Sequence, residues 1–282
     1  MSKASIFNRA RPALAFAPVA LLAMSLSACG WFSSDKDETY NEQPVEVLYN
    51  RALDDLGRQE YKLAAKEFEE VDRQHPYSVW ATKAQIMAAF TYYQSNKYDD
   101  AIIALDRFIQ LHPGHRDIPY AYYLKGLCYY EQISDVGRDQ RMTQQALDAL
   151  SDVAKRFPDS VYARDARLKV ELTIDHLAGK EMDIGRYYQK QHQYIGAINR
   201  YRTVIERYQT TTHVPEALHR LVESYLALGV QSEAKETAAV LGHNFPGSDW
   251  YADSYFLLTG EDYRIGDKSG GSGSGGWFFG LF

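Results

Sequence analysis

Cysteine is scarce in this sequence, and no arrangement typical of a metal site occurs. The 282 residues contain two cysteines, Cys29 and Cys128. Among the eight histidines, His112 and His115 flank Pro113 without a His-Glu-Xaa-Xaa-His pattern or a cysteine partner, whereas zinc sites need several closely spaced Cys, His or carboxylate ligands. We therefore expect no metal site, and we interpret these two histidines as part of a solvated turn.

The motifs of common enzyme classes are also missing. The chain has no Gly-Xaa-Ser-Xaa-Gly elbow, no phosphate-binding loop and no dinucleotide fingerprint, the patterns that position a nucleophile or bind a phosphate. A hydrolase hidden in the 160–191 stretch finds no support either, because no nucleophile is paired with a base there. The sequence predicts a protein that is not an enzyme and that takes no cofactor.

Long apolar runs are absent except near the start of the chain. Ala13–Ala28 carries no charge and follows Lys3, Arg9 and Arg11, with no acid among the first 28 residues. The run is shorter than the ~20 residues of a membrane-spanning helix, and Pro18 interrupts it. Residues 1–28 are therefore predicted to be a signal peptide.

The end of this leader has the pattern of a bacterial lipoprotein. Leu26-Ser27-Ala28-Cys29 places small residues directly before a cysteine, so we expect cleavage there and a diacylglycerol and an N-acyl group on Cys29. Several acyl chains give a stable membrane anchor, and polar residues 29–43 then form a flexible tether. Gly30 favours the outer membrane as destination. The alternative is an ordinary secretory leader with an incidental cysteine.

Basic residues are in deficit. The chain has 31 Lys and Arg against 37 Asp and Glu, and removal of a leader with three basic residues takes the net charge from −6 to −9. Phosphate backbones repel such a domain, which argues against nucleic acid as a partner. With Cys29 acylated, Cys128 is the one remaining thiol, and its apolar neighbours predict a small buried helix residue.

From Pro44 onward the sequence repeats a helical pattern five times. The segments are Tyr61–Pro76, Tyr98–Pro113, Thr143–Pro158, Tyr194–Gln209 and Gln231–Pro246. An alanine stands three places into each: Ala64, Ala101, Ala146, Ala197 and Ala234. Apolar residues follow four and seven places after it: Phe68, Leu105, Leu150, Tyr201 and Ala238, then Val71, Phe108, Val153, Val204 and Leu241. These spacings form one apolar stripe on a helix.

Another helical stretch precedes each segment, so the repeating unit is a pair of helices. This pattern resembles the tetratricopeptide repeat (TPR), whose usual length is ~34 residues. The shared features are the alanine, the large apolar residue four positions after it and the proline twelve positions after it. Such pairs cannot bury their apolar sides alone and must stack on their neighbours. The predicted fold is all-α, an α–α superhelix or TPR-like solenoid of five helix-turn-helix repeats.

Two repeats are longer than the others. The polar segment 134–141 is predicted to be a loop in the third repeat, and the fourth is predicted to have a lengthened helix pair across 160–191, broken at Gly179. Gly126 and Gly185 are interpreted as sites of close helix packing, each with the aromatic residue three places on as its partner.

The first helix of each pair lines the inner groove of a TPR superhelix. In the N-terminal half the predicted groove-facing residues include Tyr49, Phe90, Tyr93, Tyr120, Tyr123 and Tyr130. In the C-terminal half they are mainly charged or polar. The chain has 22 tyrosines, so any one of these aromatics is as readily a packing residue. As a set facing one groove, they predict a site for extended peptides with apolar or aromatic ends.

Together, the leader, the five repeats and the acidic charge resemble the BamD family of outer-membrane β-barrel assembly lipoproteins. The resemblance covers about 47–251. Its more specific stretches are Phe90-Thr91-Tyr92-Tyr93, Asp106-Arg107-Phe108-Ile109, Tyr123-Leu124-Lys125-Gly126-Leu127, Gly137-Arg138-Asp139-Gln140 and Asn199-Arg200.

This resemblance implies two binding roles on the periplasmic face of the outer membrane. The N-terminal repeats, 44–142, receive targeting segments of unfolded outer-membrane proteins, which end in an aromatic residue. The C-terminal repeats, 143–263, dock on BamA, and other assembly-machine lipoproteins are further partners. Arg200 is predicted to make an ionic contact with BamA, or else to be an ordinary surface arginine. The alternative function is a periplasmic TPR lipoprotein that organises cell-envelope or cell-division factors.

Residues 264–282 depart from that family. Lys268–Gly276 is a Gly/Ser linker, and Trp277–Phe282 is an apolar tail. The linker resembles an engineered fusion, whereas the leader favours a native sequence. The tail is predicted to dock on a partner or the bilayer interface, or to occupy the chain's own groove by imitating the terminal aromatic residue of a client.

Overall fold

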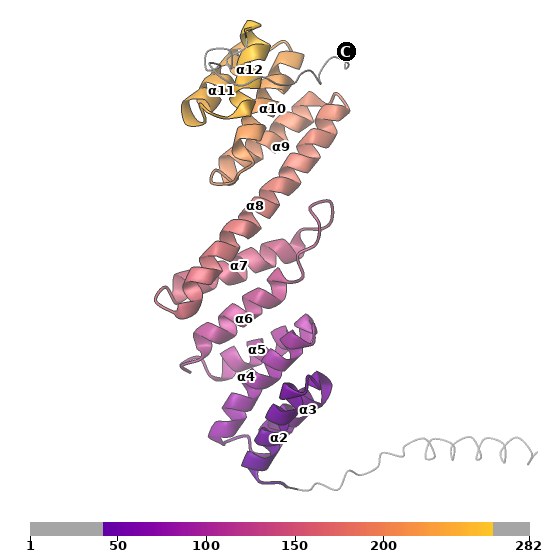
Figure 1. Cartoon of the computed structure of the whole chain (residues 1–282), viewed down its shortest axis with the longest axis vertical. Helices are drawn as coiled ribbons and strands as arrows, with labels where there is room; N and C mark the ends of the chain where they lie inside the picture. Colours follow the sequence, from indigo (N-terminus) through magenta and orange to yellow (C-terminus); the bar gives the residue numbers. More distant parts are fainter. Residues whose placement is uncertain (1–41, 262–282) are drawn as a thin grey trace, which may run out of the picture. The chain divides into compact units, whose positions relative to one another are not determined.

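The computed structural model describes residues 42–261, in which eleven α-helices and no β-strand are found (Figure 1). Ten of these helices form five consecutive pairs: α2 (Val45–Gly57) with α3 (Tyr61–Gln74), α4 (Val79–Gln94) with α5 (Tyr98–Leu111), α6 (Ile118–Tyr130) with α7 (Arg141–Arg156), α8 (Val161–Lys190) with α9 (Tyr194–Arg207), and α10 (Val214–Ala227) with α11 (Gln231–Asn244). A single helix, α12 (Asp249–Thr259), follows. The predicted leader, Cys29 and the 264–282 segment lie outside the described residues.

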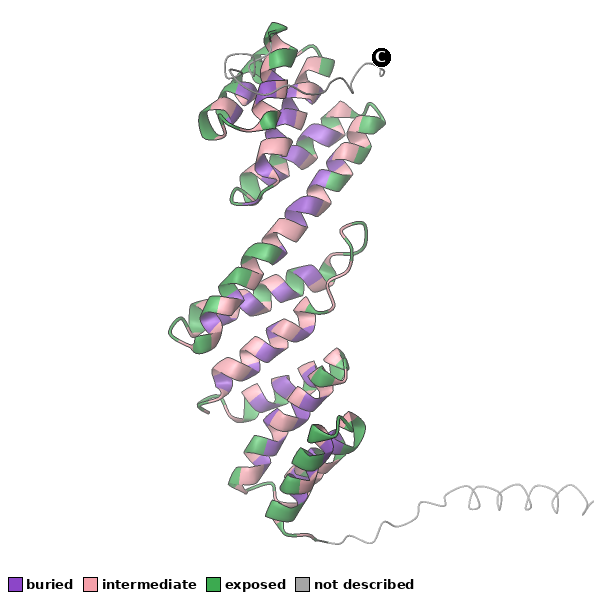
Figure 2. Cartoon of the chain, in the orientation of Figure 1, coloured by how far each residue is buried: buried purple, intermediate pink, exposed green. Residues whose placement is uncertain are grey.

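Each helix from α2 to α11 packs mainly on its neighbours in sequence, which is the contact pattern of a solenoid, whereas α12 packs mainly on α10. The predicted all-α fold of five helix-turn-helix repeats is therefore confirmed, and α12 is an additional helix that the repeat pattern did not predict. Buried residues form stripes where neighbouring helices face each other (Figure 2). None of the helices in the described part of the chain is long and apolar enough to cross a membrane.

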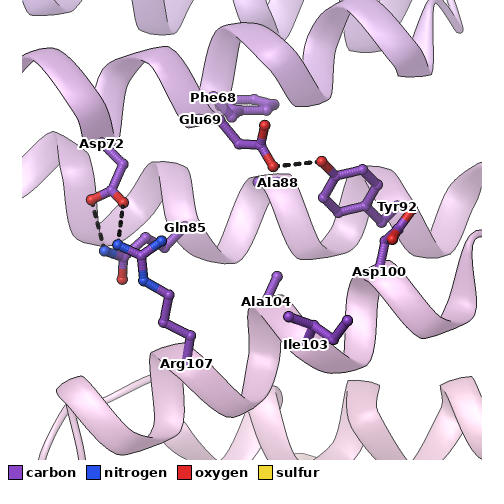
Figure 3. Close-up of a pocket in the computed structure, with 10 residues that line it drawn as sticks. All are labelled: Phe68, Glu69, Asp72, Gln85, Ala88, Tyr92, Asp100, Ile103, Ala104 and Arg107. Carbon is purple, nitrogen blue, oxygen red and sulfur yellow. Dashed lines mark hydrogen bonds and ion pairs between the residues drawn. The ribbon is translucent and has the colours of Figure 1, made fainter.

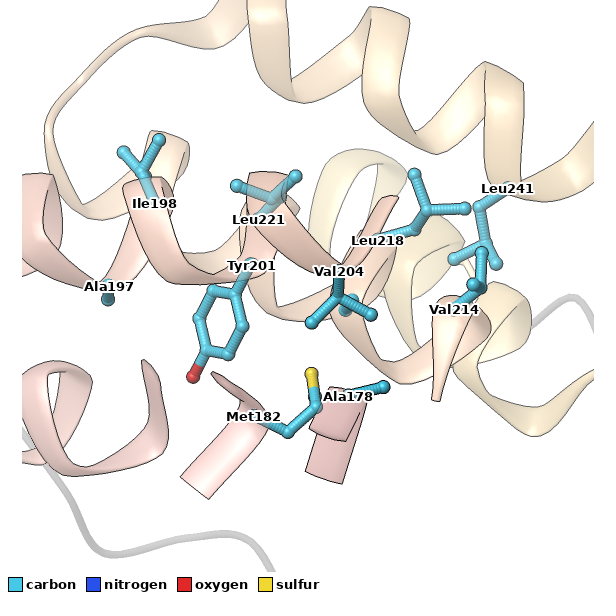
Figure 4. Packing of buried hydrophobic residues seen from close by; sticks show 11 residues of the cluster. Ala178, Met182, Ala197, Ile198, Tyr201, Val204, Val214, Leu218, Leu221 and Leu241 are labelled. Carbon is cyan, nitrogen blue, oxygen red and sulfur yellow. The ribbon is translucent and has the colours of Figure 1, made fainter. Parts of the chain in front are cut away.

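The repeated stripe of apolar residues is the core of this stack. All fifteen residues at the predicted alanine, fourth and seventh positions are buried, and each except Ala238 is 0 % exposed. In Figure 4, Tyr201 and Val204 of α9 point towards Met182 of α8, and Leu218 of α10 packs against the same cluster. Burial of a side chain of this size contributes about 1.5–3 kcal/mol, so the stripe supplies much of the stability that holds the pairs together.

Short turns connect the two helices of four pairs, and each turn contains a residue in the left-handed conformation. These residues are Gln59, Asn96, His192 and Gly229, with φ of 63°, 58°, 58° and 78°. The third pair is different because ten residues separate α6 from α7. There the Gln140 side-chain amide donates to the carbonyl oxygens of Asp135 and Arg138, both at 3.1 Å. The predicted loop is thus confirmed, except that Arg141 already begins α7.

The predicted break at Gly179 is wrong, because α8 runs unbroken from Val161 to Lys190. A Cβ at Gly179 would lie 3.3 Å from His213 Nε2 and 3.5 Å from a methyl group of Val136. The glycine therefore allows close packing instead of ending the helix. Its backbone hydrogen bonds continue through this point, so one long helix serves two neighbours: α7 and α9 both pack on it.

Gly126 and Gly185 do mark close packing, but with partners other than those predicted. A Cβ at Gly126 would lie 2.7 Å from Leu150 Cδ2, and a Cβ at Gly185 would overlap the ring of Tyr201. Both partners belong to the apolar stripe of the second helix in the pair. The glycine is required because a large stripe residue lies directly against the first helix.

Candidate functional site

Aromatic side chains of three repeats meet on one surface. We call this set the aromatic surface; it combines residues of α4, α5, α6 and α8, and all are partly exposed: Tyr93, Tyr98, Tyr120, Tyr123, Tyr130 and Tyr162. Four of them, Tyr93, Tyr120, Tyr123 and Tyr130, are residues that the repeat register predicted. Tyr98 and Tyr162 were missed, since Tyr98 begins the second helix of its pair and Tyr162 lies in the first turn of a helix whose length was not expected.

The centre of the aromatic surface is a contact between α6 and α8. The rings of Tyr123 and Tyr162 are stacked at 5.2 Å between centroids and 24°, and Tyr120 lies 5.4 Å from Tyr162. The Tyr123 hydroxyl donates to Asp165 Oδ2 at 2.5 Å, and Lys169 Nζ lies 3.1 Å from the same carboxylate. This fixed arrangement presents ring faces and edges for an aromatic or apolar ligand.

The remaining members extend the aromatic surface in both directions. The ring centroids of Tyr93 and Tyr98 are 5.9 Å apart, and Lys169 lies 5.5 Å from the centroid of Tyr130. Two exposed leucines of α8, Leu168 and Leu172, are 55 % and 59 % exposed. They occupy the same side of the helix as Asp165 and Lys169, because positions three, four and seven apart share one side. The sequence analysis did not identify Leu168 and Leu172 as part of this surface, although their spacing from Asp165 and Lys169 along one side of a helix could have indicated it.

Burial perturbs the hydroxyl groups of the aromatic surface. It raises the pKa of Tyr93 to about 12, with a further rise from Glu131, and it raises the pKa of Tyr120 to about 12, with a contribution from Tyr162. Burial also raises the pKa of Tyr123, and its hydrogen bond to Asp165 adds to the effect while lowering the pKa of that carboxyl. Tyr93, Tyr120 and Tyr123 are therefore neutral hydrogen-bond donors at physiological pH.

Two further predicted groove residues, Tyr49 and Phe90, pack against the core, and Phe90 does so in the same cluster as Tyr93, Tyr98 and Tyr120. Tyr49 is 9 % exposed and packs 5.5 Å from Phe68 and 4.9 Å from Trp80, between centroids. Phe90 is partly buried against the core cluster that contains Phe108 and Leu124. Tyr49 offers little surface to a ligand, so its observed contacts are those of a packing residue. Cys128 is buried, as predicted, and burial raises its pKa to about 12.

A small pocket lies elsewhere, between α3, α4 and α5, and none of the predicted aromatics lines it. Its volume is about 200 Å³, and Phe68, Ala88 and Ala104 are among its lining residues. Figure 3 shows polar ties beside it: the Tyr92 hydroxyl donates to Glu69 at 2.5 Å, and Asp72 accepts from Gln85 at 2.8 Å and pairs with Arg107 at 3.4 Å. The pocket and the aromatic surface are therefore separate features.

The C-terminal half, where the register predicted mainly charged or polar residues, carries a polar network between α8 and α10. Arg186 Nη1 lies 3.1 Å from both carboxylate oxygens of Glu216. Arg220 donates to Glu223 at 2.8 Å, and Glu223 also accepts from Gln189 at 2.9 Å. The first helices of consecutive repeats are thus cross-linked by charge-assisted hydrogen bonds, which are stronger than neutral ones.

This network continues into α12 through a buried histidine. His219 is 4 % exposed, with Nδ1 2.8 Å from the Ser254 hydroxyl and Nε2 3.4 Å from Glu223. The order of serine, histidine and carboxylate resembles a hydrolytic triad, but Ser254 is 0 % exposed and no substrate reaches it. The three residues attach α12 to α10. Within residues 42–261, no group of three or more His, Cys, Asp or Glu side chains is placed to hold a metal ion.

Arg200, the predicted docking residue, lies on α9 and contacts α8. Its Nη1 is 3.1 Å from Glu181 Oε2, and the two side chains are 41 % and 19 % exposed. The arginine is thus held in place by a half-buried carboxylate while part of the guanidinium stays accessible.

Comparisons with known proteins place the chain among outer-membrane assembly proteins. The family model YfiO, described as "Outer membrane lipoprotein", matches residues 41–241. The protein named "Outer membrane protein assembly factor BamD" of Caulobacter vibrioides is 50% identical over 254 residues, covering 90% of this chain and 83% of the relative. The protein of the same name in Rickettsia prowazekii is 46% identical over 239 residues, covering 85% of this chain and 95% of the relative. Among solved structures, the P58(IPK) TPR domain matches with a TM-score of 0.39 at 16% identity, over 76% of this chain and 55% of that one.

Proposed function

Because the chain belongs to the BamD family of outer-membrane protein assembly factors, we propose that its aromatic surface binds the targeting segments of unfolded outer-membrane β-barrel proteins. The observation that carries this proposal is the cluster of Tyr120, Tyr123 and Tyr162 across two repeats, in which Tyr123 and Tyr162 are stacked and Tyr120 is tilted against Tyr162. Such a stack buries an aromatic end group well, because ring pairs at these distances add about 0.5–1.5 kcal/mol beyond area burial.

The polar groups around the stack support an extended peptide as the ligand. Tyr93, Tyr120 and Tyr123 keep their protons, as their raised pKa values indicate. Lys169 beside Tyr130 supplies a positive charge next to the rings. A ligand with an aromatic residue and backbone carbonyls or a carboxylate nearby matches this combination, and the exposed Leu168 and Leu172 offer space for further apolar side chains.

A binding titration tests the proposal. A fluorescent peptide from the end of an outer-membrane protein, with a terminal Phe, is titrated with the full chain and with the Tyr123→Ser and Tyr162→Ser variants. We expect each variant to raise Kd about tenfold, the loss of a central contact of roughly 1.4 kcal/mol. Tyr187→Ser is the matched control, because Tyr187 is a 62 % exposed tyrosine of the same helix outside the aromatic surface. Equal Kd values in all four proteins would remove the proposal.

Attachment to the outer membrane belongs to the same proposal. We place the chain on the periplasmic face, held by acyl groups on Cys29, since no helix within 42–261 could span the bilayer and since multiple acyl chains are needed for stable anchoring. In a Cys29→Ala variant the protein is expected in the soluble fraction after cell lysis. Retention in the membrane fraction without its partners would show that another anchor exists.

The C-terminal repeats are proposed to dock on BamA through charged residues, with Arg200 as one contact. Glu181 holds Arg200 in one orientation at 3.1 Å, which lowers the entropy lost on binding. The test is co-purification of BamA with the Arg200→Ala variant, compared with Arg202→Ala, a neighbouring surface arginine that pairs within its own helix. Loss of BamA only with Arg200→Ala supports the contact.

A further inference from the structure

The last helix, α12, begins in the register of the first helix of a repeat, packs on α10 and α11, and is followed by no second helix within the described residues. Ser248 caps α12 by accepting from the Tyr251 backbone N–H at 3.2 Å, just as Ser78 caps α4 by accepting from Ala81 at 3.0 Å. A tryptophan follows each serine by two positions, Trp80 in α4 and Trp250 in α12. The two helices therefore begin in the same register.

This register identifies the face of α12 that lacks a partner. Eight positions after the serine stands Ile86 in α4, which is 7 % exposed and packs in a cluster with Leu105 and Phe108 of α5. The equivalent residue of α12 is Phe256, which is 54 % exposed, and the next residue, Leu257, is 47 % exposed. Where α4 is covered by α5, α12 presents an apolar face, although the ends of solenoids are normally capped by polar surfaces.

The chain itself carries a segment of matching chemistry at a suitable distance. Trp277–Phe282 contains a tryptophan, three phenylalanines and a leucine, and residues 262–276 link it to Glu261. For a random coil of these 15 residues, rich in Gly and Ser, the expected end-to-end separation is about 19–23 Å. The 11 residues of α12 extend for about 16 Å. A tail on a linker of this length has an effective concentration at Phe256 in the millimolar range.

The aromatic surface is a binding site that the same tail reaches much less easily. It lies near the start of α8, around Tyr162 and Asp165, whereas α10, on which α12 packs, contacts α8 at Arg186. The 30 residues of α8 extend for about 45 Å, while the linker reaches at most ~55 Å when fully stretched. Occupation of the chain's own aromatic surface would thus require a nearly extended linker, which loses most of its conformational entropy.

We propose that Trp277–Phe282 docks on the Phe256 and Leu257 face of α12, where it takes the place of the missing second helix of a sixth repeat. The apolar end of the solenoid is then covered by the chain's own tail, and the aromatic surface stays open for other ligands. Aromatic side chains bury 150–250 Å² each, so even partial docking removes a large apolar area from water.

Photo-crosslinking tests this docking. A benzoylphenylalanine replaces Phe279 in the full chain, which is reconstituted in phospholipid vesicles so that a bilayer competes for the tail, and crosslinked peptides are identified by mass spectrometry. The expected crosslinks join the tail to 249–259 of the same chain, which a mixture of isotope-labelled and unlabelled protein distinguishes from links between chains. Crosslinks mainly to lipid, to another chain or to the aromatic surface would overturn the proposal.

Two variants make the result specific. In the Phe256→Ser/Leu257→Ser protein the yield of crosslinks to α12 is expected to fall about fivefold or more, since the two exposed apolar side chains that bind the tail are removed. Ile195→Ser is the matched control, because Ile195 is a 68 % exposed apolar residue of α9, outside both the α12 face and the aromatic surface. An unchanged yield in the Phe256→Ser/Leu257→Ser protein, or an equal fall in the control, would also contradict the docking. Circular dichroism confirms that each variant is folded.

Discussion

At the residue scale, small side chains decide how close the helices come. Gly185 of α8 lies directly against the ring of Tyr201, which is 0 % exposed and whose hydroxyl donates to Gln189 at 2.7 Å. The contact with Gly185 and the hydrogen bond of the hydroxyl group thus hold the Tyr201 side chain in one rotamer. The sequence predicted that Gly185 is a site of close packing. It could not predict that Tyr201 is the packing partner, because residue spacing within one helix does not show which side chain of the neighbouring helix lies opposite.

We expect Gly185→Ala to destabilise the protein by about 1–3 kcal/mol, the usual cost of overpacking a core. The added methyl group would overlap the Tyr201 ring. Gly57→Ala is the control, because nothing lies within 4 Å of a Cβ at that helical position, and alanine is the better helix former. Urea unfolding measures both. Equal stabilities of Gly185→Ala and the wild type would show that this contact is not tight.

The polar network of the C-terminal half makes stability depend on pH. Burial tends to raise the pKa of Glu223, but hydrogen bonds and charges from His219 and Arg220 outweigh it and lower the value to about 2. An acid whose pKa is lowered by folding stabilises the native state above its unfolded pKa, near 4.5. That contribution disappears as the pH falls towards 2.

Between pH 5 and pH 2, the wild type is therefore expected to lose on the order of 2 kcal/mol more unfolding free energy than Glu223→Gln, which has no charge to titrate at this position. Urea denaturation at a series of pH values gives both curves. All other carboxylates are common to the two proteins, so parallel curves would mean that Glu223 is not held as its contacts indicate.

At the scale of elements, the repeat pattern predicted the second helices of the pairs better than the first. The alanine stripe fixed the position of all five second helices, and only α7 begins two residues earlier than its segment. The first helices have less regular sequences, and α8 shows why: its 30 residues pack on α7 and α9, so it carries two apolar faces in succession. Gly179 looked like a helix end because its tertiary contacts with His213 and Val136 are invisible in the sequence.

Helix caps provide a prediction at this scale. The hydroxyl groups of Ser78 and Ser248 accept hydrogen bonds at the starts of α4 and α12, whereas the Ser160 hydroxyl before α8 is buried without a hydrogen-bond partner. Ser78→Ala and Ser248→Ala are each expected to cost about 1 kcal/mol, and Ser160→Ala close to nothing. Thermal unfolding compares the three. A larger effect of Ser160→Ala than of the other two would contradict the assigned caps.

At the scale of the whole molecule, the solenoid brings together side chains that are far apart in the sequence. Tyr123 and Tyr162 stack across two repeats, and Tyr93 joins them from a third. The register placed Tyr93, Tyr120, Tyr123 and Tyr130 on this surface, but it also selected Tyr49, which Phe68 and Trp80 bury. Exposure depends on the bulk of neighbouring helices, so sequence periodicity identifies a side of a helix without showing which of its residues stay accessible.

The central claim, that the aromatic surface receives unfolded outer-membrane proteins, is tested most directly by photo-crosslinking in living cells. A photoreactive amino acid replaces Tyr123 or Tyr162, and Tyr187 in a control strain, and the crosslinked proteins are identified by mass spectrometry. We predict nascent β-barrel proteins at the first two positions and far fewer at Tyr187. An absence of barrel proteins at Tyr123 and Tyr162, or equal recovery from Tyr187, would contradict this account.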